Sequence, residues 1–313
     1  MKQTNYLWEQ TKYSTLNKVL RFLAFNTHHG NSVLVLSMKK LMVLTVFAYR
    51  SAASLGNRRK TLRSTKLYKN TKSDKDLMII GGGPSVSQLN IKQVVESQTS
   101  GSLDVMVMNW YSHTRYAEII RPDYYVLSDP FTIPGGNNSW KSQNTAEIWK
   151  KLEQWPDSKL IVPAHWFPLM QSVDNGVACY IDDRELVGFS SNIDITKPRG
   201  YCSLTAYKAI AAGIYMGYQN IFLIGFDGST FASTIVDEDN HLYEGKNNNS
   251  DTEFTPIVKL DSYFPNGIAD LLFANSSAFL DLRKCFKNKN VVNLQRDSYI
   301  DAFRKENNKY VNW

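Results

Sequence analysis

Short apolar runs alternate with amphipathic stretches along residues 76–313. The runs predict strands, and the stretches with apolar residues at helical spacing predict helices. The expected strands cover 77–80, 103–108, 124–127, 159–162, 220–225 and 290–294, and the expected helices cover 86–98, 115–121, 146–154, 204–216 and 269–286. Strands that alternate with helices predict an α/β fold with a doubly wound, mostly parallel sheet.

Three segments of the body lack this regular pattern. Residues 132–144 and 228–265 are rich in small and polar residues, so we predict surface loops there. A long loop next to a strand end is often an active-site lid, which is the role we assign to about 228–265. The polar and aromatic segment 165–200 shows no clear period.

Polar residues follow several of the predicted strands. In a doubly wound sheet the ligand binds beyond the carboxyl ends of the strands. We therefore expect one binding edge that contains Asn109, Ser128, Asp129, Asp227 and Gln295.

The first strand ends in a glycine-rich loop, Gly81, Gly82 and Gly83, followed by Pro84 and Ser85. Glycine lets the backbone approach a ligand closely, and proline is suited to the first turn of a helix. Free N–H groups at a helix start attract phosphate. The loop lacks the spacing of the dinucleotide fingerprint and of the P-loop, so a nucleotide site and a plain strand-to-helix turn are both open.

Basic residues are concentrated at the N-terminus. Residues 1–75 carry 15 Lys and Arg but only Glu9 and Asp74 as acids, and residues 76–313 carry 21 Lys and Arg against 27 Asp and Glu. The apolar run 33–49 is split by Lys39 and Lys40, which favours an interfacial helix over a spanning one. We predict a leader, 1–75, whose residues 31–75 contact an anionic membrane surface, and a body, 76–313.

This leader suggests a protein that contacts a membrane surface from the cytoplasm. Its apolar content disfavours nucleic acid as the partner. The alternative is a helix that packs on the body, followed by a solvated basic linker. The sequence leaves a homo-oligomer open.

No metal site is expected. Cys179, Cys202 and Cys285 lack metal-type spacing and suit a reducing compartment. The acidic pairs at 182–183 and 237–239 are interpreted as a turn and a solvated loop. His113 and His165 follow strand ends and are candidate ligand contacts, whereas His241 lies in the predicted lid and suits a general base.

Four segments, taken in order, resemble the bacterial sialyltransferases of glycosyltransferase family 42 and their relatives in surface-polysaccharide gene clusters. They are Ile80–Ser85, Met108–Tyr111, Ala209–Asp227 and Val292–Ser298. The resemblance covers about 76–304. It departs from the family at Gly82, where the family has asparagine, and in the shorter spacing from Asp227 to His241.

The resemblance implies a Rossmann-like transferase that uses CMP-sialic acid without a metal or another cofactor. Gly81, Gly83 and Ser85 would face the phosphate and ribose, and Asn109 the cytidine nucleotide. The family's Thr-Ser-Gly motif would fall near Ser203 or Thr205. His241 would deprotonate the acceptor hydroxyl, and Tyr243 is the nearest candidate to assist phosphate departure. The acceptor would be a glycan or lipid-linked oligosaccharide. The leader would then hold the enzyme on the inner face of the bacterial inner membrane, in the cytoplasm.

Two alternatives remain open from the sequence. One is a pyrophosphokinase-like enzyme of the pterin type, which would use ATP and Mg²⁺. The other is a non-catalytic nucleotide-sugar-binding protein of the same fold.

Overall fold

The structure is a computed structural model that describes residues 37, 41, 44–45, 62–129, 132–133, 139–187, 193–197, 199–200, 204–229 and 268–312. Within these residues, eight parallel strands form one open sheet in the order β10-β9-β8-β1-β2-β3-β4-β5. The strands are β1 (Asp76–Ile80), β2 (Leu103–Met108), β3 (Tyr124–Val126), β4 (Lys159–Pro163), β5 (Val177–Tyr180), β8 (Ile221–Ile224), β9 (Val291–Asn293) and β10 (Arg304–Lys305). The predicted doubly wound α/β fold is confirmed.

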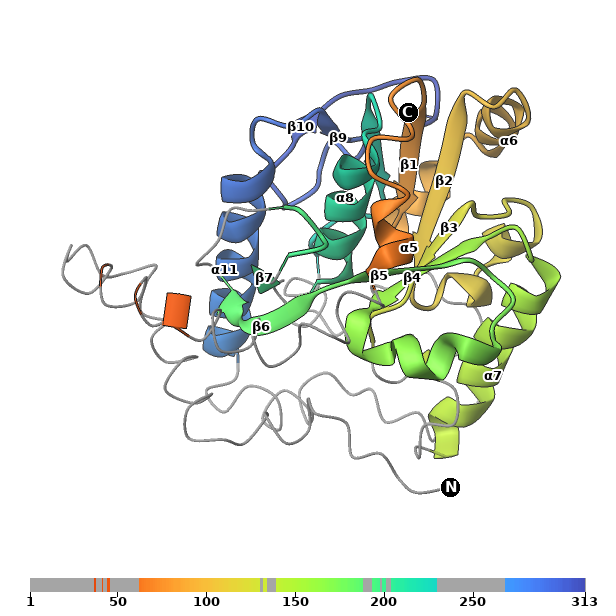
Figure 1. Cartoon of the computed structure of the whole chain (residues 1–313). Coiled ribbons are helices and arrows are strands. Elements are labelled where there is room, and N and C mark those ends of the chain that lie inside the picture. The colour runs from red at the N-terminus through yellow and green to blue at the C-terminus, as the bar shows by residue number, and fades with distance from the viewer. Residues whose placement is uncertain are drawn as a thin grey trace.

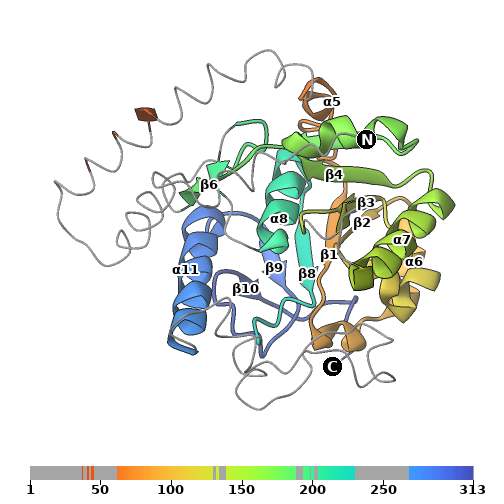
Figure 2. The ribbon, with the colours of Figure 1, turned by 90° about the horizontal axis from the view of Figure 1, so that it is seen from below.

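Helices cover both faces of the sheet (Figures 1 and 2). One face carries α6 (Ile91–Thr99) and α7 (Ser139–Gln154), and the other carries α8 (Thr205–Met216) and α11 (Ile268–Phe286). The side chains of β1 alternate between the two resulting cores. Leu77 and Ile79 pack on the α8 side, and Met78 and Ile80 on the α6 side. All four are buried, which explains why β1 reads as a continuous apolar run.

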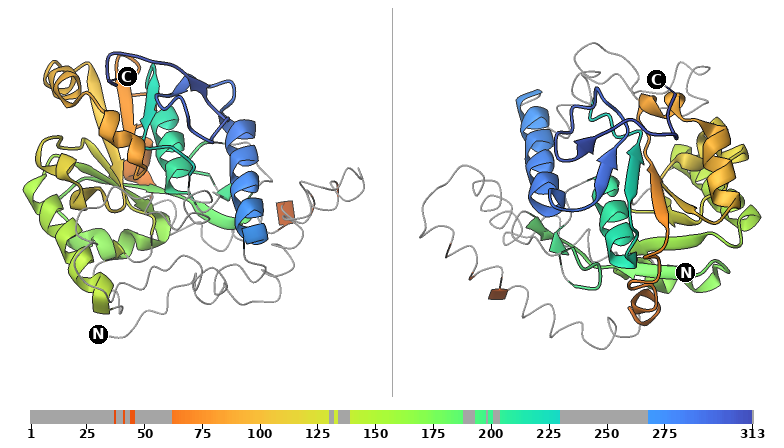
Figure 3. Two further views of the ribbon diagram at one scale, coloured as in Figure 1. Left: turned by 180° about the vertical axis from the view of Figure 1, so that it is seen from behind. Right: turned by 90° about the horizontal axis from the view of Figure 1, so that it is seen from above.

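The strand order reverses between β1 and β8, which are direct neighbours. From β1 the chain moves outward through β2, β3, β4 and β5, and it then returns through α8 to β8 on the other side of β1. Figure 3 shows this return from two further directions. A reversal of this kind opens a crevice at the carboxyl ends of the two central strands. The predicted glycine loop follows β1 at this position.

Two features of α8 explain its close packing and its end. A Cβ on Gly213 would lie 2.6 Å from Leu77 Cδ2, so glycine lets the helix approach β1. Gly217 has a φ of 88° and caps the helix in the left-handed conformation that glycine adopts without strain.

Several predicted boundaries are wrong. The helix expected over 86–98 is divided into a short 3-10 helix, η1 (Pro84–Gln88), and α6, because Asn90 accepts a hydrogen bond from Gln93 N at 3.2 Å and starts a new helix. The stretch expected to be helical over 115–121 is the shorter 3-10 helix η3 (Arg115–Glu118). The loop expected over 132–144 is already helical from Ser139.

The segment without a clear period, 165–200, contains several elements. They are η5 (Ala164–Ser172), β5, and the small parallel pair β6 (Asp182–Val187) and β7 (Arg199–Gly200). The acidic pair that we interpreted as a turn, Asp182 and Asp183, therefore opens a strand. A 3-10 helix, η2 (Tyr111–His113), follows β2.

Residues 62–75 pack on the sheet. A short helix, α5 (Arg63–Lys66), lies against β5, and the Thr65 hydroxyl donates to Cys179 O at 2.9 Å and accepts from Cys179 N at 2.7 Å. Further along, Lys72 and Lys75 form ion pairs with Asp104 at 2.8 and 3.0 Å. These two lysines, which belong to the segment 31–75 predicted to contact lipid, therefore have a protein partner.

The Asp104 carboxylate lies at the amino end of β2 and is buried. Burial by itself would raise its pKa, but hydrogen bonds from Lys72, Tyr218 and Lys75 lower the pKa below the ordinary value of 3.8. The Tyr218 hydroxyl donates to the carboxylate at 2.6 Å. No helix within the described residues is both long and apolar enough to cross a membrane.

Candidate nucleotide site

The glycine loop and the end of β8 approach each other at the point where the strand order reverses. Gly81 N donates to Ile224 O at 2.7 Å, and Gly83 N donates to Gly225 O at 3.0 Å. A Cβ on Gly81 would lie 2.4 Å from Gly225 O, and one on Gly83 would lie 1.9 Å from Asp227 Oδ2. These two glycines are therefore required by the contact between chain segments, whatever ligand binds nearby.

The helix expected directly after this loop is the short 3-10 helix η1, with Pro84 at its first position. No α-helix therefore starts at Pro84, and the expected helix dipole directed at a phosphate is absent from this position. Gly82, between the two packed glycines, is half-buried.

Asp227 holds the loop in place. Its Oδ2 accepts from Ser85 Oγ at 3.0 Å and from Ser85 N at 3.4 Å, and Gly225 N donates back to Ser85 Oγ at 3.0 Å. Asp227 is 8% exposed, and burial raises its pKa, although the two bonds from Ser85 act in the opposite direction. Ser85 and Asp227, both predicted as site residues, are thus brought together as a clasp across the crevice.

Three other predicted residues meet beside this clasp, at the carboxyl ends of β2 and β3. Asn109 Nδ2 donates to Thr205 Oγ1 at 2.8 Å, and Asn109 Oδ1 accepts from Ser128 N at 3.3 Å. The hydroxyls of Ser128 and Thr205 lie 2.6 Å apart. We call Asn109, Ser128 and Thr205 the polar triangle.

Asn109 has a strained backbone conformation that two hydrogen bonds hold in place. Its φ is 45°, a left-handed conformation that only a few non-glycine residues adopt and that asparagine tolerates best. The conformation is held by Asn109 N, which donates to Val126 O at 3.0 Å, and by Asn109 O, which accepts from the Tyr125 hydroxyl at 2.6 Å. Strain of this kind is common at ligand sites.

The third corner of the triangle is the first residue of α8. Leu204 precedes Thr205 as the N-cap and supplies no side-chain hydrogen bond to the helix end. The positive end of this 12-residue helix therefore faces the polar triangle. One turn later lies Lys208, which is 3% exposed and whose Nζ is 5.8 Å from the centre of the Tyr180 ring.

Lys208 was missed by the sequence analysis. The signal that could have found it is a lone charged residue on the inner face of an otherwise apolar helix, Thr205–Met216. A buried lysine is rare unless it has a partner or a function.

The remaining predicted site residues are divided. Asp129 is half-buried, and its backbone carbonyl accepts from Thr132 N at 2.9 Å and Thr132 Oγ1 at 2.7 Å. Gln295 follows β9 as expected and is buried, with a side-chain oxygen that has no hydrogen-bond donor among the described residues. Ser203, His241, Tyr243 and most of the predicted lid, 228–265, lie outside the described residues.

The two histidines predicted as ligand contacts have different surroundings. His113 Nε2 lies 3.3 Å from Glu147 Oε2 on α7, and its Nδ1 lies 3.0 Å from Ser112 Oγ. His113 therefore connects the segment after β2 to α7. His165 is exposed, and its ring packs edge-on to Trp166. In the part of the chain that the structure describes, no three His, Cys, Asp or Glu side chains converge.

Comparisons with known proteins give a distant structural similarity. No protein-family model and no curated protein matches the chain. Among solved structures, the chain is similar to the MAf glycosyltransferase from Magnetospirillum magneticum AMB-1, with 17% sequence identity and a TM-score of 0.33. The match covers 63% of this chain and 32% of that chain, so the chain spans about a third of that protein's length. A similarity at this TM-score carries no argument about function, and the sialyltransferase resemblance stays a prediction.

Proposed function

We propose that the protein is a glycosyltransferase that moves sialic acid, or a related acidic sugar, from a CMP-sugar donor to a surface glycan such as O-antigen or lipooligosaccharide. The observation that carries the proposal is the polar triangle beside the Ser85–Asp227 clasp, at the carboxyl edge where the strand order reverses. An amide and two hydroxyls at this edge suit the polar edges and hydroxyls of a nucleoside.

The nucleotide phosphate has a favourable place at the start of α8. The helix end carries partial positive charge, and the first turn supplies N–H groups without a side-chain cap. Lys208 adds a full positive charge one turn away. Charge that develops on the leaving phosphate can then be stabilised by backbone N–H groups, hydroxyls and a lysine, so we propose that the reaction is independent of a metal.

The reaction is an inverting displacement. The acceptor oxygen forms a bond to the anomeric carbon of the sugar, and the bond from that carbon to the phosphate oxygen of the donor breaks. The bonding electron pair leaves with CMP. The acceptor proton passes to His241, and Tyr243 donates a hydrogen bond to the departing phosphate. The roles of His241, Tyr243 and Ser203 come from the sequence resemblance.

The basic N-terminal leader indicates where in the cell the protein would act. Cationic segments with apolar residues bind anionic lipid surfaces, and a lipid-linked oligosaccharide would lie on the inner face of the inner membrane. Residues 62–75 pack on the sheet, and Lys72 and Lys75 pair with Asp104. We therefore assign the membrane contact to residues before 62.

Calorimetric titration of the full chain with CMP, UDP, GDP and ATP, each with and without Mg²⁺, tests the donor. Micromolar CMP binding that does not need Mg²⁺ is the expected result. A preference for UDP or GDP would overturn the CMP-sugar donor, and binding of ATP only with Mg²⁺ would favour the pyrophosphokinase-like alternative.

Two substitutions test the site itself. Thr205→Val removes the hydroxyl that contacts both Asn109 and Ser128, and we expect CMP affinity to fall about tenfold, the effect of roughly one lost hydrogen bond to a charged or polar ligand. The matched control is Thr99→Val, on the exposed side of α6, which removes only a bond to Val95 O. Equal CMP affinity in both variants would refute the assigned site.

The non-catalytic alternative is tested by product formation. We expect the wild-type protein to transfer the sugar, and His241→Ala to bind CMP normally while transfer is lost. A protein that binds CMP but yields no product with any CMP-sugar and glycan acceptor would be a binding protein of this fold.

A further inference from the structure

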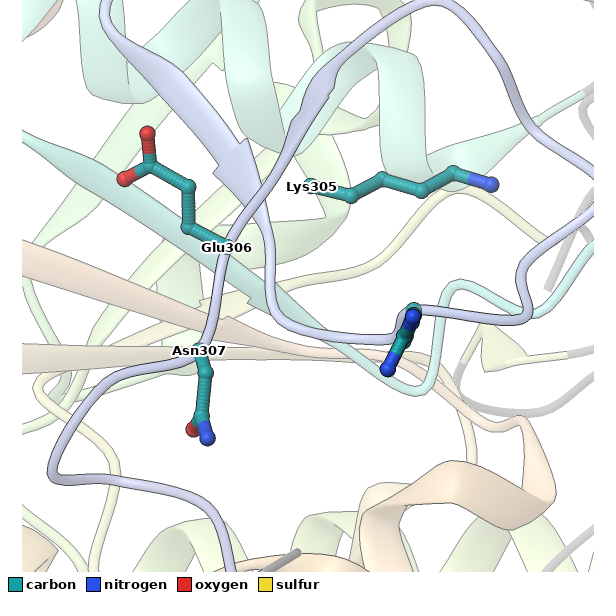
Figure 4. Close-up of a pocket in the computed structure, with 4 residues that line it drawn as sticks. Lys305, Glu306 and Asn307 are labelled. Carbon is teal, nitrogen blue, oxygen red and sulfur yellow. The ribbon is translucent and has the colours of Figure 1, made fainter.

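A cavity of about 340 Å³ that opens to solvent and is lined by exposed residues lies at the carboxyl ends of β9 and β10. Its lining residues are Arg296, which follows β9, and Lys305, Glu306 and Asn307, which end and follow β10 (Figure 4). The volume falls in the range that holds small ligands, and one or two sugar residues fit such a space.

The cavity is connected to the proposed nucleotide site by a short path of hydrogen bonds. The Ser298 hydroxyl donates to Phe226 O at 2.6 Å, and Tyr299 N donates to Asp227 O at 2.8 Å. The turn that carries Arg296 is therefore bonded to Asp227, which in turn binds Ser85. Lys305 Nζ donates to Ser298 O, which fixes one cation of the cavity to the same turn.

Charge in the cavity is positive. Glu306 forms an ion pair with Arg304 Nε at 2.7 Å, so its charge is largely balanced. Arg296 forms no ion pair or hydrogen bond with the described residues. Lys305 Nζ uses one of its three N–H donors for the bond to Ser298 O. In Figure 4 the side chains of Lys305 and Glu306 extend to opposite sides of the backbone.

We propose that this cavity binds an anionic sugar residue, one that carries a carboxylate or a phosphate. Arg296 is suited to a bidentate contact with either group, Lys305 supplies a second positive charge, and the Asn307 amide donates or accepts at sugar hydroxyls. The site itself follows from the cavity alone. The further statement that the bound sugar belongs to the acceptor rests on the proposed function.

The test measures binding of three probes to the full chain by saturation-transfer NMR and calorimetry: glucose 1-phosphate, glucuronate and glucose. We expect both acidic probes to bind, glucose to bind at least about tenfold more weakly, and the affinities to fall as salt is raised, because charge-assisted contacts dominate. A clear preference between the two acidic probes identifies the phosphate or the carboxylate as the recognised group.

Two substitutions with opposite expected effects on affinity locate the site. Arg296→Gln is expected to weaken glucose 1-phosphate binding about tenfold. Glu306→Gln, which removes the one carboxylate among the described lining residues, is expected to tighten it about threefold. The matched control is Arg121→Gln, an exposed arginine before the amino end of β3, whereas the cavity lies at the carboxyl ends of its strands. All three residues are exposed, so the fold is expected to survive each change.

Three outcomes would overturn the proposal: glucose that binds as tightly as glucose 1-phosphate, Arg296→Gln that behaves like Arg121→Gln, or Glu306→Gln that weakens binding. The Thr205→Val variant separates this site from the nucleotide site. It should lose CMP affinity while it retains the affinity for glucose 1-phosphate. Binding of the acidic sugar by a protein that binds no nucleotide would leave the cavity site intact and reject the proposed function.

Discussion

Gly81→Ala tests whether the contact between the glycine loop and β8 sets the shape of the crevice. The new Cβ would lie 2.4 Å from Gly225 O and 2.9 Å from Gly225 C, whereas real Cβ atoms stay beyond about 3.0 Å of such atoms. Both obstructing atoms belong to the backbone, so no side chain can rotate away. The loop must move from β8, and the 3.0 Å bond from Gly83 N to Gly225 O is lost.

The expected cost follows from these two effects. Overpacking costs about 1–3 kcal/mol and the lost hydrogen bond about 1 kcal/mol. Alanine lowers the conformational entropy of the unfolded chain relative to glycine, which offsets roughly 0.5 kcal/mol of this cost. We therefore expect a net destabilisation of about 2–3 kcal/mol. With a urea m-value of about 3 kcal/mol/M, the unfolding midpoint should fall by about 0.7–1 M. Tryptophan fluorescence of the full chain measures that midpoint.

Gly83→Ala behaves differently because its main obstacle is a side chain. Here the Cβ would lie 1.9 Å from Asp227 Oδ2 and 2.8 Å from Gly225 O. Asp227 can rotate away, but it then loses both bonds from Ser85. In an Asp227→Ala background these bonds are already absent and most of the clash is gone, so Gly83→Ala should cost about 1–2 kcal/mol less there.

Gly81→Ala, in contrast, should cost the same with or without Asp227, because its clash is with Gly225. The reasoning is refuted by a Gly81→Ala variant with the wild-type midpoint. It is equally refuted by additive costs for Gly83→Ala and Asp227→Ala.

Three further predictions concern single side chains. Asp104→Asn should destabilise the protein by about 2 kcal/mol at pH 7, because it leaves the Lys72 ammonium without its carboxylate partner. The folded pKa of Asp104 lies below 3.8, so the difference in stability from the wild type should shrink as the pH falls through that range. Urea unfolding at pH 7 and pH 3 measures this difference. Thr65→Val should cost about 1–3 kcal/mol, because a buried backbone N–H loses its acceptor, and thermal unfolding checks this. Lys208→Met keeps the packing on Tyr180 but removes the charge, so CMP affinity should fall about tenfold in calorimetry, and an unchanged affinity would exclude Lys208 from phosphate binding.

The sequence predicted the sheet and most strand-end residues because both depend on local patterns. Buried parallel strands are continuous apolar runs, and the residues that follow them lie at the carboxyl ends of the strands, so the sequence alone places Asn109, Ser128 and Asp227 there. The interpretation of the glycine loop was less complete. It left a nucleotide site and a plain strand-to-helix turn open, and it did not show that two of the glycines are required by Gly225 and Asp227, more than a hundred residues away in sequence.

Other misses have the same origin. The pairing of Lys72 and Lys75 with Asp104 joins residues of the leader to the second strand, and the charge pattern alone shows only a basic segment. The helix expected over 86–98 is divided next to Leu89, which pairs with Val311 at the far end of the chain, and the new helix starts at the cap residue Asn90. The cavity beside β10 was missed because a two-residue strand leaves no periodicity to detect.

The contact between α5 and β5 protects an edge of the sheet. β5 is a terminal strand, and strands of this kind expose backbone groups that can pair with another chain. Ser64 Oγ donates to Val177 O at 2.9 Å and the Thr65 hydroxyl occupies both backbone groups of Cys179, so side chains fill the positions that a ninth strand would take. Cutting the chain at residue 76 would uncover these groups and create a surface for edge-to-edge aggregation, whereas a chain that begins before residue 62 would retain its own barrier against self-association.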